Sequence, residues 1–424
     1  MMNQENRITA ASPILAAHNG VQPRFGFGLA ILCIYMFARP LAAMEIPISF
    51  GMFSFNEFFA LFGSVLLIIA LVPQAKVTNF APLVAFYGLY CILNSIMGGK
   101  YRDIARQLLP FVCFFSASSM IKKEEDLKRV TNFLLWGFVI TIWLNTLYVF
   151  KGHGVGMVLY HTHLPRYQGL FRNVHSMAHI MLLFSFIYYF YYINSDSWYK
   201  YRLKLKDVIL FFTLCFSVYC IYKSVTRTAM VGFISFWLLV LLLHHKKLFV
   251  IFMLLISVTV ALQTDKIKII FYDVDRALTT KAEYYENLAG GGRIYLWKYN
   301  WNYFVNLPLE RKLVGIGIGN EGIDGTAKEG QIPESHNDFL SVLITMGLFG
   351  LLLYIVLICF LIYSTKSLDI SRRIKSWQLC VIITVCIMNF FSNSYINRFE
   401  LSQIFWYLMA LPLAISNIHN YGYK

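Results

Sequence analysis

Charged residues are scarce in this chain. Asp, Glu, Lys and Arg make up 14% of its 424 residues, hydrophobic residues make up 58%, and the mean hydropathy is +0.58. A soluble domain of this size could not solvate so apolar a surface, so a soluble enzyme is excluded. The apolar runs are continuous, whereas a β-barrel would alternate within segments of about 10 residues. The composition therefore predicts an all-α polytopic membrane protein.

Metal, redox and nucleotide motifs are also missing. No CxxC pair occurs, and all eight cysteines lie inside apolar runs, so we expect them to be buried small hydrophobic residues. His175 and His179 have a spacing that could bind zinc, but no third ligand is evident. The glycines at 315, 317 and 319 have no βαβ context and predict a turn. The sequence predicts neither a metal nor a cofactor.

The apolar runs predict about twelve transmembrane helices. They cover residues 25–44, 54–72, 78–97, 107–121, 129–150, 174–194, 207–223, 228–244, 248–263, 338–364, 377–393 and 404–418. The fourth run is short and predicts a tilted or broken helix. We divide the chain into nine helices within 1–263, one large polar loop at 264–337, and three helices within 338–424.

Basic residues fix the expected orientation. They recur at every second short connection, as the positive-inside rule requires of cytoplasmic loops: Lys122 and Lys123, Arg202 and Lys204, Lys246 and Lys247, and Arg372 and Arg373. Both termini are then cytoplasmic, and the large loop lies outside. That loop carries nine basic and ten acidic residues, so it is no nucleic-acid surface. Lipid and topology account for the basic loops, and nucleic acid is excluded as a partner.

Several arginines lie where the predicted spans meet the outer face. Arg102 precedes the fourth span, and Arg166 and Arg172 precede the sixth. Arg227 lies in the very short connection between the seventh and eighth spans. Charges at this depth face a cavity or a partner, or else extend to the lipid headgroups. The connection that holds Arg227 is too short for its side chain to leave the bundle.

Arg293 follows three glycines and opens a predicted helix that extends to Val305. Aromatic residues lie around nearly the whole circumference of this helix, which is typical of a helix at headgroup level. The aromatic side chains are explained as membrane anchors. An arginine at the start of such a helix is placed to bind a phosphate with two hydrogen bonds.

His336 lies at the start of the tenth span. We interpret Ser335 as the N-cap and Asp338 as the third residue of a capping box, which places His336 in the first helical turn. A helix N-terminus attracts phosphate, and a neutral histidine there can act as a general base. A histidine at an interface can equally be a hydrogen-bonded structural residue.

These residues resemble the motifs of one membrane family. His336 and Asn337, followed after nine residues by Gly-Leu-Phe-Gly at 347–350, are similar to the signature of the O-antigen ligase and O-antigen polymerase superfamily. Thr-Arg-Thr-Ala at 226–229 resembles its first arginine motif, and Gly292-Arg293 with Trp297 resembles the second. The segment from Pro308 to the glycines at 315 and 317 resembles the family segment that follows the second arginine motif. The topology of twelve spans and one large loop also fits.

The resemblance implies a fold of the membrane glycosyltransferase C type and an active site at the periplasmic face of the bacterial inner membrane. It implies a glycan donor on undecaprenyl diphosphate and an inverting, metal-independent transfer. His336, Arg293 and Arg227 would be the catalytic residues, with Arg166, Arg172, Asn337 and Arg102 as contacts to diphosphate or substrate. Further partners would be the acceptor glycan, the bilayer, a chain-length regulator and a flippase.

Two acceptors fit the same motifs. A polymerase extends O-antigen or a related surface polysaccharide by joining lipid-linked repeat units, whereas a ligase transfers the finished chain to lipid A-core. The segment Glu-Ser-His-Asn-Asp-Phe-Leu at 334–340 resembles the polymerases more and therefore favours the polymerase. A transporter of polysaccharide or lipid-linked oligosaccharide stays as a third hypothesis, although transporters place their charges near the midplane, at broken helices.

Overall fold

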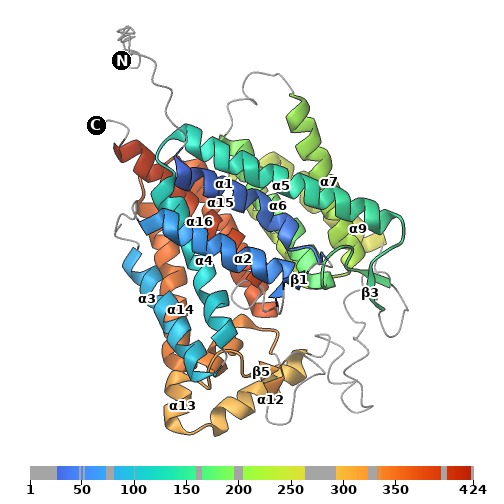
Figure 1. Ribbon diagram of the computed structural model, residues 1–424. Coiled ribbons are helices and arrows are strands. Elements are labelled where there is room, and N and C mark those ends of the chain that lie inside the picture. Colours follow the sequence, from blue (N-terminus) through green and yellow to red (C-terminus); the bar gives the residue numbers. More distant parts are fainter. Residues whose placement is uncertain are drawn as a thin grey trace, which may run out of the picture.

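The computed structural model describes residues 26–46, 49–50, 53–72, 81–99, 101–158, 165–194, 204–262, 293–322, 332–333, 335–392 and 399–421. This part of the chain is an α-helical bundle (Figure 1). The three glycines at 290–292, Glu334 and most of the large loop lie outside the described residues.

Each of the twelve predicted spans contains a helix. These helices are α1 (Phe27–Ala42), α2 (Phe55–Leu71), α3 (Ala81–Met97), α4 (Tyr101–Met120), α5 (Glu124–Phe150), α6 (Val174–Asn194), α7 (Leu205–Ser224), α8 (Arg227–His244), α9 (Lys246–Leu262), α14 (Asp338–Ser367), α15 (Arg372–Phe391) and α16 (Phe399–Tyr421). Within the described residues, seven helices are long and apolar enough to cross a membrane, and four shorter ones are apolar. The fold is thus that of a polytopic membrane protein, and twelve crossings remain a prediction.

The predicted boundaries differ most at the fourth span. The sequence predicts a short helix from residue 107, whereas α4 begins at Tyr101 and is 20 residues long, with Pro110 inside it. The charged residues of its first turns interrupt the hydrophobic run but not the helix. Apolarity therefore marks the part of α4 that is mostly buried in the bundle, and not the whole helix.

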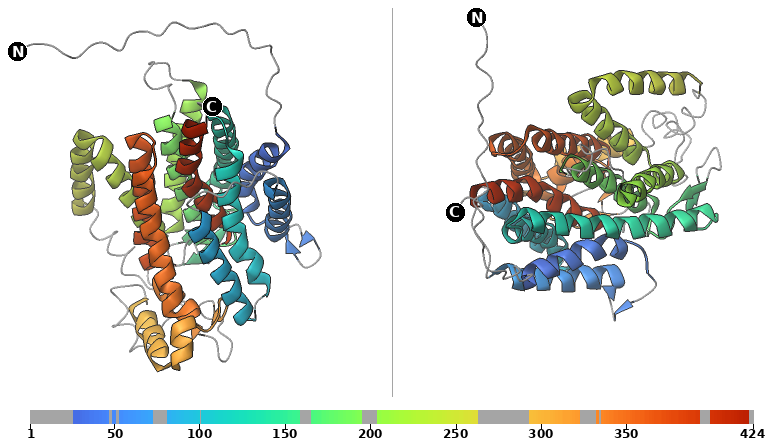
Figure 2. Two further views of the ribbon diagram at one scale, coloured as in Figure 1. Left: turned by 90° about the vertical axis from the view of Figure 1, so that its left-hand side faces the viewer. Right: turned by 90° about the horizontal axis from the view of Figure 1, so that it is seen from above.

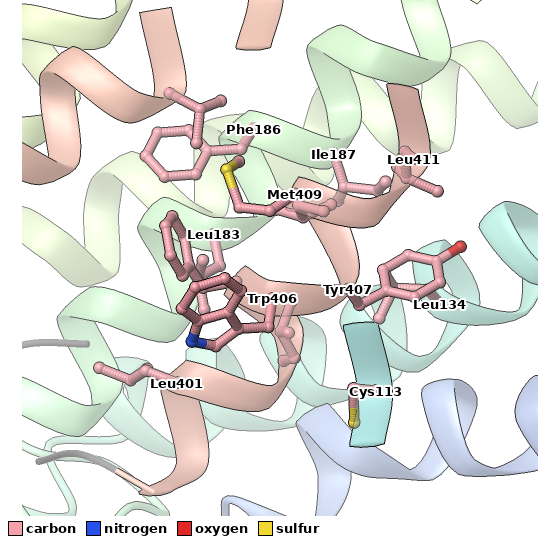
Figure 3. Close-up of a cluster of buried hydrophobic side chains, with 14 of the residues drawn as sticks. Cys113, Leu134, Leu183, Phe186, Ile187, Leu401, Trp406, Tyr407, Met409 and Leu411 are labelled. Atoms are coloured by element: carbon pink, nitrogen blue, oxygen red, sulfur yellow. The ribbon is translucent and has the colours of Figure 1, made fainter. Parts of the chain in front are cut away.

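The core of the bundle lies around α6 and α16, which are almost wholly buried. Figure 3 shows side chains of α16 packed between those of α6 on one side and those of α4 and α5 on the other. There Trp406 and Met409 of α16 lie beside Leu183 and Phe186 of α6, while Tyr407 points to the other side, toward Leu134 of α5. Burying each such side chain stabilises helix association through close packing, since lipid is as apolar as the side chains themselves.

The described residues of the large loop form the helices α12 (Arg293–Asn306) and α13 (Leu309–Val314). The predicted helix from Arg293 to Val305 is confirmed to within one residue. Both helices lie at one end of the bundle, opposite the end at which α16 finishes (Figures 1 and 2). We call this the loop end.

The described residues also form three short two-stranded sheets. The strands β1 (Ser49–Phe50) and β2 (Phe53–Ser54) pair antiparallel, as do β3 (Val155–Val158) and β4 (Pro165–Tyr167). The strands β5 (Glu321–Gly322) and β6 (Ile332–Pro333) pair in parallel. The β3–β4 sheet matters for the site because it carries Arg166 beside α7.

Helix α14 folds back on itself at Gly347. This residue has φ 71° and ψ −175°, which no helix contains. The rings of Phe339 and Tyr354 lie 5.6 Å apart, whereas a straight helix would separate these residues by about 22 Å along its axis. A Cβ built on Gly350 would lie 2.3 Å from the Cβ of Met346. Residues 338–346 therefore pack against the part that follows Gly347, and we call this arrangement the α14 hairpin.

The turn of the α14 hairpin is held by the glycine-rich segment at 315–319. The backbone N–H groups of Ile316 and Gly317 donate to the carbonyls of Ile344 and Thr345, which a broken helix leaves without partners. A Cβ on Gly315 would lie 2.2 Å from the Thr345 carbonyl oxygen, so this approach requires glycine. The predicted turn is confirmed, and the reason for its glycines is close backbone contact.

Asn94 of α3 forms hydrogen bonds to the glycine-rich segment and to the residue before it. Its amide nitrogen donates to the Val314 carbonyl at 2.8 Å, and its amide oxygen accepts from the Ile318 N–H at 2.9 Å. The side chain is fully buried, so losing it would leave buried backbone groups unpaired, at a cost of about 1–3 kcal/mol each. Asn94 thereby fixes the turn of the α14 hairpin to α3.

Candidate active site

Arg227 is the first residue of α8 and follows α7 after a two-residue connection. Val225 ends α7 in the left-handed conformation, with φ 50°. The Thr226 hydroxyl donates to the Val174 carbonyl at 3.4 Å, and His179 lies 3.4 Å from the Thr228 hydroxyl. These contacts fix the turn to the start of α6. The half-buried Arg227 side chain therefore projects from a rigid connection.

Arg166 supports this turn from the β3–β4 sheet. Its Nε donates to the Ser224 carbonyl at 3.1 Å, and the side chain is only 4% exposed. Arg172 is exposed, and Arg102 lies in the first turn of α4. The geometry thus brings Arg166 next to the Arg227 turn and gives Arg166 a backbone contact that positions that turn. The predicted diphosphate contacts of these three arginines stay predictions.

Arg293 and His336 belong to a second group of contacts. The Arg293 guanidinium donates to the Phe391 carbonyl at the end of α15. One helical turn later, the Trp297 indole donates to the Ser335 carbonyl at 2.9 Å, directly before His336. The Trp297 ring also packs edge-on against Phe390, with 5.5 Å between centroids. Helix α12 therefore ties the histidine loop to the end of α15.

The predicted capping box at His336 is wrong. The N-cap is Asn337, whose side chain accepts from the Leu340 N–H at 3.1 Å, and the helix begins at Asp338. The Ser335 hydroxyl donates instead to the Asn337 carbonyl at 3.0 Å. His336 precedes the helix and has φ 48°, in the left-handed region that histidine adopts more readily than most residues. The tight loop explains why the cap lies two residues later than the sequence motif indicates.

The α14 hairpin places this loop inside the bundle. Phe339 packs against Tyr354, which is seven residues beyond the turn and so about 10 Å along the helix from it. Asp338, directly before Phe339, is fully buried. His336 is half-buried just before this position. The histidine loop is thus recessed from the turn of the hairpin, and His336 lies two residues before the start of α14.

The position of Arg227 relative to Arg293 can be inferred from the last turns of α15, which contact both α12 and α8. Arg293 contacts Phe391, and Trp297 packs on Phe390. A Cβ on Gly232 of α8 would lie 2.3 Å from Met388, so α8 crosses α15 closely one turn and a half beyond Arg227. Because α8 and α15 run in opposite directions, Arg227 lies near the level of the α15 end. Arg227 therefore lies at a similar level along the bundle to the contact between Arg293 and Phe391.

A cavity adjoins this level. It lies between α14 and α15 on one side and α3, α4 and α16 on the other. Its lining includes Tyr354 and Asn389, and the Asn389 amide nitrogen donates to the Tyr354 hydroxyl at 2.7 Å. The sequence analysis missed both residues. A polar side chain within an apolar span, as Asn389 is, was the available signal.

Metal-binding groups were not predicted, and the described residues contain no cluster of three or more His, Cys, Asp or Glu side chains suited to a metal. The expected burial of the cysteines is wrong for two of them. Cys215 and Cys359 are exposed on the surfaces of α7 and α14, while Cys33, Cys91, Cys113, Cys220 and Cys380 are buried. The apolar runs contain lipid-facing positions as well as core positions, so the pattern could not separate them.

A protein-family model matches part of this chain. Residues 211–355 match the model of a family described as O-Antigen ligase. The match covers about a third of the chain and extends from α7 through α8, α12 and α13 to the α14 hairpin. No curated protein matches the chain. With the motifs at Arg227, Arg293 and His336 inside the matched segment, the match confirms the resemblance of this chain to the O-antigen polymerase and ligase superfamily.

Proposed function

We propose that this protein transfers a glycan from undecaprenyl diphosphate to a sugar hydroxyl and so polymerises repeat units of O-antigen or a related surface polysaccharide. The observation that carries the proposal is the joint placement of Arg293 and His336 by Trp297, at the level of Arg227. Two cations and one potential base at one level fit the departure of a diphosphate and the attack of a hydroxyl.

In the proposed reaction, the acceptor hydroxyl attacks the anomeric carbon opposite the diphosphate. A new carbon–oxygen bond forms as the bond to the diphosphate oxygen breaks, with inversion at the carbon. The electron pair leaves with undecaprenyl diphosphate, and Arg227 and Arg293 stabilise the charge that develops there. His336 accepts the proton of the attacking hydroxyl, or else orients the diphosphate. The arginines take the place that a divalent metal has in many soluble glycosyltransferases.

A ligase is the second candidate, because the matched family is described as O-Antigen ligase. It would use the same donor and the same three residues, with lipid A-core as the acceptor. The segment at 334–340 keeps the polymerase as our first proposal. In both cases we place the reaction at the periplasmic face of the inner membrane, with both termini in the cytoplasm.

A lipopolysaccharide banding gel of a deletion strain tests this proposal. A polymerase predicts lipid A-core with a single repeat unit and no ladder, restored by the gene. Bare core with polymer retained on undecaprenyl diphosphate would instead identify the ligase. An unchanged ladder in lipopolysaccharide, capsule and exopolysaccharide would contradict both, and loss of export of an intact polymer would support the transporter.

A further inference from the structure

The cavity beside α14 has two chemically different ends. At one end Tyr354 and Asn389 are hydrogen-bonded, next to Tyr87 of α3 and Gln107 of α4. Seven residues further along each helix, the lining consists of Leu361 on α14 and Ile382 on α15, and is apolar. Seven residues correspond to about 10 Å. The cavity therefore extends about 10 Å along α14 and α15, away from a polar end.

The polar end faces the candidate active site. Phe339, three residues after His336, packs on Tyr354, and Phe391, two residues after Asn389, accepts from Arg293. Asn389 is 1% exposed, and its amide oxygen has no hydrogen-bond partner among the described residues. A buried acceptor without a partner is costly, so a ligand that donates to it would be stabilised there.

The lining carries no charged side chain. It consists of Tyr87, Gln107, Pro110, Phe111, Tyr354, Leu357, Ile358, Leu361, Ile382, Val385, Cys386, Asn389, Phe405 and Trp406. The cations lie beyond the polar end, where Arg293 contacts Phe391. An uncharged, mostly apolar interior with a cation beyond its polar end is complementary to an amphiphile with a hydrocarbon chain and an anionic head.

We propose that this cavity binds the first isoprenoid units of the lipid donor, so that the chain lies between α14 and α4 and the diphosphate lies at Arg293. The inference rests on the proposed function for the identity of the lipid. It assigns a new role to Tyr354 and Asn389, which mark the boundary between the hydrocarbon and the diphosphate. The inference also assigns a role to the α14 hairpin, because the reversal at Gly347 brings the histidine loop to the polar end of the cavity.

Photocrosslinking tests this inference. The purified full-length protein is incubated with a polyprenyl diphosphate that carries a diazirine in its first isoprene units, and the labelled peptides are mapped by mass spectrometry. We expect labels within 354–361 and 382–389, which excess unlabelled polyprenyl diphosphate removes. Labels outside the cavity would overturn the inference. Equal competition by a diacyl phospholipid would also overturn it, because the cavity would then hold membrane acyl chains.

Two variants of α15 form a matched pair. Cys386→Phe places a ring in the cavity, while Ile383→Phe adds the same ring at a position that is 39% exposed on the outer surface of the helix. We expect Cys386→Phe to lower the crosslinking yield at least tenfold and Ile383→Phe to leave it unchanged, at equal melting temperatures. Equal yields from both variants would contradict the inference.

The outcome separates the inference from the proposed function. Glycan transfer by a protein that is labelled away from the cavity would leave the function standing and overturn the lipid site. Labelling in the cavity without glycan transfer would support the lipid site and contradict the proposed function.

Discussion

Arg293 is the residue for which sequence and structure agree most closely. The sequence places it at the start of an aromatic helix, and α12 begins there, with the guanidinium at the α15 end. Arg293→Ala should lower glycan transfer by about 10²–10³-fold, the usual effect of removing one group that stabilises a developing anion. Arg293→Lys should restore part of the activity, since it keeps the charge and loses the two-pronged geometry.

The control for this prediction is Lys298→Ala, an exposed cation on the same helix. Lys298→Ala should leave glycan transfer unchanged, and both Arg293 variants and this control are measured by the polysaccharide ladders that they produce. Equal losses from both variants would show that the net charge of the helix matters, and not the position of Arg293.

His336 is tested by two substitutions. A general base contributes about 10²–10⁴-fold, so His336→Gln, which keeps hydrogen bonding but cannot accept the proton, should be as inactive as His336→Ala. The measurement is the rate of polymer formation at equal protein levels. Full activity of the glutamine variant would rule out the base and leave an orienting role.

Trp297 of α12 contacts both the histidine loop and the end of α15. Trp297→Phe keeps a ring against Phe390 and removes the donor to the Ser335 carbonyl, which positions the histidine loop. We expect transfer to fall by about tenfold, corresponding to a lost hydrogen bond of about 1–1.5 kcal/mol. Trp301→Phe, at a position that is 52% exposed on the same helix, should retain wild-type activity. A normal rate for Trp297→Phe would show that this hydrogen bond does not position His336.

At the scale of elements, the α14 hairpin is the feature that the sequence analysis did not predict. In the sequence, Gly347 and Gly350 belong to the Gly-Leu-Phe-Gly signature, which does not indicate a reversal of the chain. The available signal was length, because the predicted span at 338–364 is longer than the roughly 20 residues that a membrane span requires. Asn94 gave a second signal as an amide in an apolar run. Neither reveals a reversal by itself, since the turn is held by the segment at 315–319, which is in turn bonded to Asn94, more than 200 residues away in sequence.

Gly347→Ala tests the hairpin. A Cβ there would lie 2.3 Å from the Leu313 carbonyl oxygen, in addition to the cost of a positive φ. Gly152→Ala is the control, because Gly152 also has a positive φ, of 77°, but open space around it, so its cost is the strain alone, about 1–2 kcal/mol. We expect a markedly larger drop in melting temperature, with loss of transfer, for Gly347→Ala. Equal drops in both variants would contradict the close approach.

At the scale of the molecule, the hydrophobic pattern located the helices well. Each of twelve predicted spans contains a helix, because long apolar runs in lipid have few alternatives to helix formation. The pattern could not give the packing around α6 and α16 or the convergence at the end of α15. Those depend on which faces meet, and helices that are apolar all round do not encode that in their periodicity.

The orientation is a prediction for the whole molecule. Alkaline phosphatase inserted after Gly325 should be active, because the large loop is expected outside, whereas fusion to Lys424 should be inactive in the cytoplasm. Fusion of green fluorescent protein at the same two positions should give the opposite pattern. An active phosphatase at Lys424 would invert the topology and remove the periplasmic site.

The central claim is glycan transfer by Arg227, Arg293 and His336, and a reaction with purified components tests it most directly. The protein in detergent, with EDTA present, is given an undecaprenyl-diphosphate-linked repeat unit, and the products are followed by mass spectrometry. The account predicts lipid-linked chains of two or more repeats together with released undecaprenyl diphosphate, and loss of both products in Arg293→Ala and His336→Ala. Unchanged product formation by these two variants would contradict it.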